Sequence, residues 1–167
     1  MQAYTHVIAG AFIEYGARRG LRSRPLAVLA TAVAGPVSHI VLDALSILTY
    51  HPASASWDDP AWVSIHALGY ALAIFLAVKL RRFWFGIGMA LLPDLDWVVR
   101  ALSSPPLWRP GALHAWFAAL PGLWEVCRAC EALPNLRALP LAAVPELLVG
   151  IAAAIHVSRS SPYSWKC

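Results

Sequence analysis

The chain has 167 residues, of which 59% are apolar and 13% are charged, about half the charged share usual for soluble domains. Its formal net charge is +4, its isoelectric point is near 9.3 and its mean hydropathy is +0.60. This composition excludes a disordered chain, a basic protein that coats nucleic acid and an ordinary soluble enzyme, because a soluble domain needs more polar surface to cover itself. We therefore expect one all-α domain over residues 1–167, a polytopic bundle of membrane helices with lipid as its partner and no nucleic acid.

Stretches without acidic or basic side chains indicate where the chain crosses the membrane, since a span needs roughly 20 largely apolar residues. The first stretch, residues 3–15, is short, and a tilted span, a re-entrant helix and an interfacial helix all fit it. It is not typical of a signal peptide, because Glu14 interrupts it and the basic cluster follows it. The later stretches are residues 25–48, 60–78, 83–99, 110–124 and 138–157. The sequence thus predicts about five to six transmembrane segments.

Basic residues predict the orientation of these segments, because they gather in loops on the cytoplasmic side. One set of alternate loops holds Arg18, Arg19, Arg22, Arg24, Lys79, Arg81, Arg82, Arg128 and Arg137. The opposite set holds Arg100, Arg109, Arg159 and Lys166. We expect the larger set on the cytoplasmic side and, if the chain crosses six times, both termini on the outer side.

This orientation places most histidines and aspartates at one level of the bilayer. The residues expected in the outer half or in outer loops are His6, His39, Asp43, His51, His66, Asp94, Asp96 and His114. The residues expected on the other side are Glu14, Glu125 and Glu131. Ionisable groups are costly at membrane depth, so each is a functional-site hypothesis, and their gathering in one leaflet favours a shared site.

His39 and Asp43 are about one helical turn apart, so their side chains project from one face. Imidazole nitrogens and carboxylate oxygens are good zinc ligands, and this pair could chelate a divalent cation. Pro36 precedes the pair, and a proline inside a span indicates that the region packs against protein or lines a cavity. The alternative is a His–Asp hydrogen bond that joins two helices.

A second candidate motif is Leu-Leu-Pro-Asp-Leu-Asp-Trp at residues 91–97. Pro93 suits the first turn of a new helix. Asp94 and Asp96 could both reach a metal from an irregular turn. The alternative is a helix N-terminus whose acids are stabilised by the helix dipole, which suits acids at a surface better than acids among apolar residues. Weaker single candidates are His6, His114, His51 and His66.

Two other features fit simpler interpretations. Glu146 and His156 lie in the last segment and are interpreted as a polar contact between helices, outside the metal site. Cys127 and Cys130 form one C-x-x-C, which is a weak zinc signal without a second pair. Two small apolar residues on a helix are the favoured interpretation of that spacing.

Thr5-His6, the S-H-x-x-x-D stretch at residues 38–43, L-P-D-x-D at residues 92–96 and the stretch from Arg109 to His114 together resemble the YdjM-like small membrane proteins. Those proteins are described as membrane-bound metal-dependent hydrolases, similar to zinc-dependent phospholipase C. In their usual order L-P-D-x-D comes first, whereas here it comes second. The resemblance implies an inner membrane protein, bacterial or archaeal, and these metal ligands: His6, His39, Asp43, Asp94 and His114, with Asp96 as a ligand or as a carboxylate that orients one.

The functional expectation is a membrane-embedded, metal-dependent phosphoesterase that acts on a phospholipid or lipid-linked phosphate from the outer leaflet. A divalent ion, zinc before others, would lower the pKa of a bound water to roughly 7. Asp94 or Asp96 would be the catalytic carboxylate that orients or deprotonates this water. Arg100 or Arg109 would hold the substrate phosphate.

Two rival hypotheses remain open. The chain could be a non-catalytic accessory or structural subunit of a larger membrane complex, in which histidines bind a pigment or haem or tie helices together. It could also form a metal or proton pathway, with carboxylates and histidines in a chain across the bilayer. The gathering of these residues in one leaflet argues against a continuous pathway.

Overall fold

The structure, a computed structural model, describes residues 2–52, 56–102 and 112–159, and every regular element in that part of the chain is helical. The predicted all-α class is confirmed. The long helices are α1 (Ala3–Gly20), α2 (Arg24–Ala44), α3 (Pro60–Lys79) and α8 (Ala143–Arg159). The short helices are α4 (Trp84–Leu91), α5 (Leu95–Leu102), α6 (Ala112–Ala118) and α7 (Leu123–Glu131). The 3-10 turns are η1 (Leu45–Leu48), η2 (Arg81–Phe83), η3 (Leu92–Asp94) and η4 (Pro140–Ala142).

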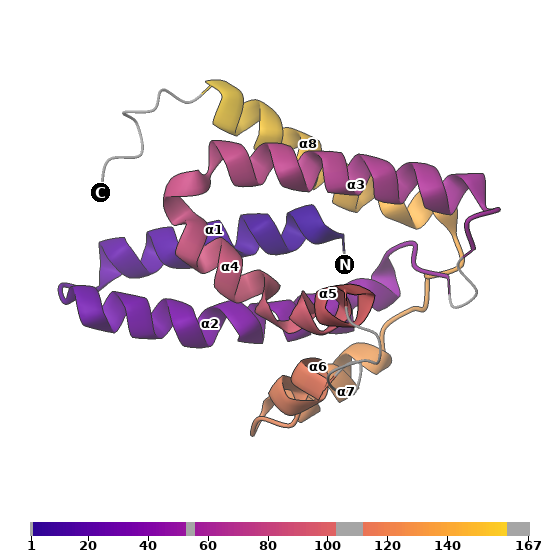
Figure 1. The fold of residues 1–167 in the computed structure, drawn as a ribbon. Helices are drawn as coiled ribbons and strands as arrows, with labels where there is room; N and C mark the ends of the chain where they lie inside the picture. The colour runs from indigo at the N-terminus through magenta and orange to yellow at the C-terminus, as the bar shows by residue number, and fades with distance from the viewer. Residues whose placement is uncertain (1, 53–55, 103–111, 160–167) are drawn as a thin grey trace.

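The long helices lie side by side, and α4 packs against both α1 and α2 (Figure 1). α1 and α2 run in opposite directions, so the bundle has two distinct ends. The basic end, as we name it, holds the end of α1, the start of α2 and the ends of α3 and α8. The site end holds the start of α1, the end of α2 and the start of α3. The basic side chains of the basic end are Arg18, Arg19, Arg22, Arg24, Lys79, Arg81, Arg82 and Arg159.

Local chemistry explains how two of these helices start and pack. Asp59 caps α3, because its Oδ1 accepts the backbone N–H groups of Ala61 and Trp62 at 2.9 and 3.1 Å. α1 and α4 approach so closely that a Cβ on Gly86 would lie 2.2 Å from the carbonyl oxygen of Gly10. Such small-residue contacts are the usual way for apolar helices to pack tightly.

Three helices are long and apolar enough to cross a membrane: Arg24–Leu48, Pro60–Lys79 and Pro140–Arg159. They correspond to the predicted segments 25–48, 60–78 and 138–157. Their outer surfaces are apolar, with exposed fractions of 67% for Ile74 and 60% for Leu148. The other predicted segments do not meet this criterion of length and hydropathy in the described part of the chain, because α1 is too polar and the helix that begins at Trp84 is broken at Pro93.

The predicted segment at residues 110–124 is wrong as a single span. α6 has seven residues, and after it the chain turns at Pro121 and Gly122, whose φ of 84° favours glycine. α7 then returns beside α2. Because this hairpin does not run the length of the bundle, its charges lie at the site end and not with the basic cluster as predicted. The residues concerned are Arg128, Arg137, Glu125 and Glu131, whereas Arg159 lies at the basic end.

Candidate metal centre

Four donor atoms from three segments, α2, η3 and α6, meet at the site end of the bundle. They are Nε2 of His39, Oδ2 of Asp43, Oδ1 of Asp94 and Nε2 of His114. His39 Nε2 lies 3.1 Å from Asp43 Oδ2, 3.5 Å from Asp94 Oδ1 and 3.1 Å from His114 Nε2. His114 Nε2 lies 3.5 Å from Asp43 Oδ2 and 3.6 Å from Asp94 Oδ1. Three of these residues, His39, Asp94 and His114, form a group that could hold a metal ion.

Secondary structure explains why these residues converge. His39 and Asp43 lie one turn apart on α2, as the sequence predicts. Pro93 is the second residue of η3, which turns the chain so that Asp94 faces α2. α6 brings His114 against the same helix end. The rings are more buried than the acids: the side chain of His39 is 0% exposed, against 34% for Asp43 and 40% for Asp94. The cluster is therefore held by protein on one side and accessible on the other.

The orientation of the His39 ring is fixed by a backbone contact. Its Nδ1 lies 2.7 Å from the carbonyl oxygen of Ala90, which can only accept a hydrogen bond. Nδ1 therefore carries the proton, and the lone pair of Nε2 points into the cluster. This is the tautomer that metal-ligating histidines adopt.

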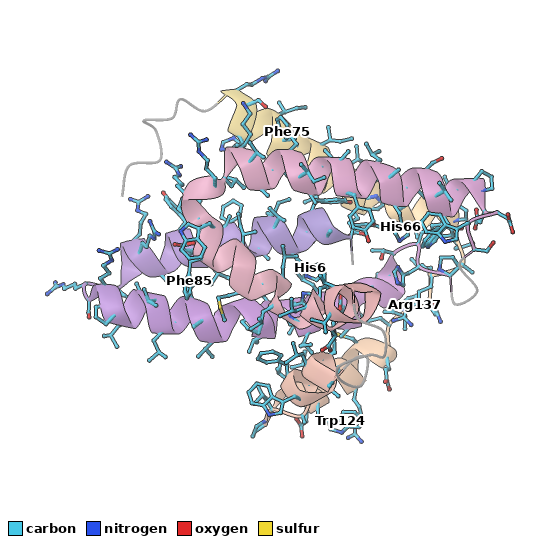
Figure 2. The ribbon with its side chains drawn as sticks, in the orientation of Figure 1. His6, His66, Phe75, Phe85, Trp124 and Arg137 are labelled. Atoms are coloured by element: carbon cyan, nitrogen blue, oxygen red, sulfur yellow. The ribbon has the colours of Figure 1, made fainter. Side chains whose placement is uncertain are left out.

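His6 approaches the cluster from α1 through the other oxygen of Asp43. Its Nε2 lies 3.2 Å from Asp43 Oδ1, and its ring stacks on that of His39 with the centroids 4.0 Å apart. His6, His39 and Asp43 form a second group that could hold a metal ion. Asp43 thus links His6 to the other donors. Figure 2 shows His6 at the site end, inside the bundle.

Asp96 lies behind His114 and not among the four donors. It is 0% exposed, its Oδ2 accepts the backbone N–H of Leu113 at 2.8 Å, and the same oxygen lies 3.6 Å from Nδ1 of His114. A carboxylate on the far nitrogen of a ligating histidine orients the ring and raises its basicity. The hydrogen bond with Asp43 raises the pKa of His114 above its usual value. A cation bound there would compete with a proton.

No family model, curated protein or solved structure matches the chain.

The remaining candidates lie away from these donors. His51 and His66 face each other with ring centroids 5.9 Å apart, His66 Nδ1 donates to the carbonyl of Trp62, and burial lowers the pKa of His51. Neither belongs to the two groups that could hold a metal among the described residues. Arg100 lies on α5 without a described side chain, and Arg109 lies outside the described residues.

Glu146 makes the polar helix contact that its position predicts. Its Oε1 accepts the backbone N–H of Gln2 and the hydroxyl of Thr5, both at 2.7 Å, so it ties α8 to the start of α1. This contact holds the segment that carries His6. Cys127 and Cys130 are free cysteines on α7.

A cavity of about 400 Å³ opens beside the donors, and sequence reasoning missed part of its lining. Asp43 and His114 form one wall, and Cys127, Glu131 and Arg137 line it as well. Arg137 was predicted to lie at the opposite end of the molecule. No local motif marks it, because backbone pairs between segments far apart in sequence bring it here: Leu136 donates to Ile47, and His51 donates to Arg137.

Proposed function

We propose that the protein is a membrane-embedded metal-dependent hydrolase, a phosphoesterase that acts on a lipid or lipid-linked phosphate. The observation that carries the proposal is the spacing of the four donor atoms, 3.1–3.6 Å over the pairs given above. Zinc bonds of about 2.0–2.2 Å place neighbouring ligand atoms of a tetrahedron about 3.3–3.6 Å apart. The two imidazole nitrogens and one of the two carboxylate oxygens therefore match three ligand positions of one zinc ion, which leaves the fourth position for a water.

The residues around the donors support hydrolysis. A bound zinc ion supplies Lewis acidity and lowers the pKa of a coordinated water to about 7. Asp94, the most exposed carboxylate of the cluster, is placed to accept a proton from water entering through the open side. The carboxylate of Asp96 lies 3.6 Å from the far nitrogen of the His114 ring, and the Ala90 carbonyl holds the ring of His39. The protein thus contributes fixed ligands, a proton acceptor and an adjoining cavity.

The bundle supports a site at membrane depth. Beyond the three long apolar helices, we propose that α1 and the broken α4–α5 segment also cross, which gives five crossings. The α6–α7 hairpin would then lie at the membrane surface, where the exposed rings of Trp116 and Trp124 suit the headgroup region (Figure 2). The eight basic side chains of the basic end favour that end as the cytoplasmic one. A substrate phosphate would reach the site from the outer leaflet.

Metal content tests the first step. Protein purified in detergent should retain about one equivalent of zinc per tetrahedral site. His39→Ala and Asp43→Ala should lose it, whereas His66→Ala should retain it. Metal-free wild-type protein, or equal zinc in all four proteins, would refute the site. A screen of phosphoesters with the zinc-loaded protein then tests hydrolysis.

Labelling tests the orientation. With Cys130 and Cys167 replaced by serine, an impermeant thiol reagent should reach Cys127 from one side of sealed vesicles and Arg22→Cys from the other. Burial raises the pKa of Cys127, so labelling is expected to be faster at alkaline pH. Labelling of both positions from the same side would contradict the proposed arrangement.

The second candidate function is a non-catalytic subunit of a larger membrane complex. It is favoured by the fact that the same rings and carboxylates contact one another and so can tie α1, α2 and α6 together. Thermal stability in zinc and in chelator separates the two candidates. Direct contacts between these side chains need no metal, so a subunit of this kind would be equally stable in both.

A further inference from the structure

We propose that Arg137 binds the phosphoryl oxygens of the substrate in the cavity beside the donors. This inference rests on the proposed function and names a contact of the same site. Arg100 and Arg109 were the residues expected to hold phosphate, and Arg137 was assigned to the other end of the molecule. Arg137 and the two donor residues Asp43 and His114 line one cavity. Figure 2 shows Arg137 at the site end of the bundle.

Arg137 is held in place by its surroundings on several sides. Its backbone N–H donates to Asn135 Oδ1 at 3.2 Å, and its carbonyl accepts the N–H of His51 at 2.9 Å. One guanidinium nitrogen, Nη2, donates to the hydroxyl of Ser46, a buried residue of η1, at 3.2 Å. The guanidinium group is therefore fixed in position before any substrate arrives, which lowers the entropic cost of binding.

The guanidinium group also has unused hydrogen-bonding capacity. Its Nε is buried, and among the described residues it has no hydrogen-bond partner. Arginine presents several N–H donors in a planar fork that matches two oxygens of a phosphate. Glu131 is the other charged residue of the lining outside the donor set, and its side chain is exposed. The chemistry thus fits an anion that bridges the cavity between Arg137 and a bound cation.

A phosphate diester has the atoms for this bridge. One oxygen faces the cation site at Asp43 and His114, and another faces Arg137. The cavity of about 400 Å³ has room for a headgroup and not for a whole lipid, whose chains would extend into the bilayer. The shared ligand chemistry is a phosphoryl group, whether it belongs to a lipid headgroup or to a soluble phosphodiester.

Steady-state kinetics with two probes test the assignment: a short-chain phosphatidylcholine in detergent micelles and soluble bis(p-nitrophenyl) phosphate, both with zinc-loaded protein. Arg137→Ala should raise KM about 10- to 100-fold, the loss expected for a charge-assisted hydrogen bond. Its zinc content should equal that of the wild type. Arg137→Lys should recover part of the loss, because it keeps the charge without the fork.

Arg128→Ala is the matched control, because it removes an exposed arginine of α7 that does not line the cavity, and it should leave KM unchanged. Ser46→Ala removes the hydrogen bond that holds the guanidinium group of Arg137, so it should raise KM by less than Arg137→Ala does. A larger effect with the micellar probe would assign the ligand to a lipid headgroup, and equal effects would assign it to phosphate itself.

The outcomes separate this inference from the proposed function. An unchanged KM in Arg137→Ala, with metal-dependent hydrolysis intact, would overturn the role of Arg137 and leave the hydrolase standing. A wild type that binds zinc but hydrolyses no phosphoester would overturn the proposed function. In that case binding of inorganic phosphate to the zinc-loaded protein still tests Arg137: the wild type should bind it about 10- to 100-fold more tightly than Arg137→Ala, and equal binding would overturn the assignment.

Discussion

Replacing His39 with alanine should remove most of the stabilisation that zinc gives to the folded protein. His39 Nε2 takes part in three of the five donor–donor distances given above, more than the oxygen of either acid. Loss of a residue that only orients a ligand costs 10- to 100-fold in metal affinity, so loss of the ligand itself should cost at least about 100-fold. The alanine variant should therefore bind zinc far more weakly than the wild type.

The size of the effect follows from mass action. At a zinc concentration about 100 times the wild-type Kd, binding stabilises the folded state by about 2.7 kcal/mol. For a chain of this size 1 kcal/mol shifts Tm by about 2–4 °C, so the wild type should melt about 5–11 °C higher in zinc than in chelator. A 100-fold weaker variant binds with Kd equal to the zinc concentration and gains about 0.4 kcal/mol, or about 1 °C.

The assay is thermal unfolding in detergent, with zinc and with chelator, and the quantity compared is the difference between the two Tm values. This difference matters because His39→Ala also loses the hydrogen bond to Ala90 and leaves a cavity at a fully buried ring. Its Tm in chelator should fall for that reason alone. His66→Ala, which loses a stacked contact with Trp62, is the control and should keep the full zinc-dependent shift. If zinc raised the Tm of His39→Ala by as much as it raises that of the wild type, the reasoning would be refuted.

Three further predictions test the surroundings of the site. Asp96→Asn should lower zinc affinity about 10- to 100-fold in a chelator competition while the protein stays folded, because His114 loses the charge behind its ring. Gly86→Ala should destabilise the protein by about 1–3 kcal/mol in denaturant unfolding, whereas Gly88→Ala, which meets no atom within 4 Å, should not. Glu146→Leu leaves the backbone N–H of Gln2 and the hydroxyl of Thr5 without their acceptor, which should cost about 1–3 kcal/mol of folding free energy for each donor left unsatisfied. The Tm should therefore fall, while the zinc content stays unchanged.

Much of the candidate site could be predicted from the sequence, because its signals are local or follow from depth. The i, i+4 spacing of His39 and Asp43 puts both on one helix face, and the structure keeps them 3.1 Å apart. His6, Asp94 and His114 were expected at the same depth in the membrane, because each lies near the outer end of its apolar stretch. Asp94 and Asp96 were both expected to be able to reach a metal, whereas in the structure Asp94 joins the donors and Asp96 lies behind His114.

The contacts that orient the site could not be predicted, because they join segments far apart in sequence. The carbonyl of Ala90 sets the tautomer of His39 across 51 positions of the chain, and no side-chain pattern marks a backbone acceptor. The backbone N–H of Leu113 likewise fixes Asp96 across 17 positions of the chain. Sequence reasoning finds which residues can bind an ion, whereas tertiary packing decides which nitrogen or oxygen each one presents.

The misplaced hairpin shows how one local turn changes the electrostatic argument for the whole chain. Arg128 and Arg137 were predicted to lie on the cytoplasmic side because residues 110–124 were expected to cross the membrane. The turn at Pro121 and Gly122 keeps them at the site end, and Arg159 moves to the basic end. The basic end still carries most of the basic side chains after this exchange, so the orientation proposed from the charge asymmetry does not change. Arg137 thereby becomes a half-buried cation that lines the cavity together with Asp43 and Glu131, and this placement, with the unpartnered Nε, is the basis for the proposed phosphoryl contact.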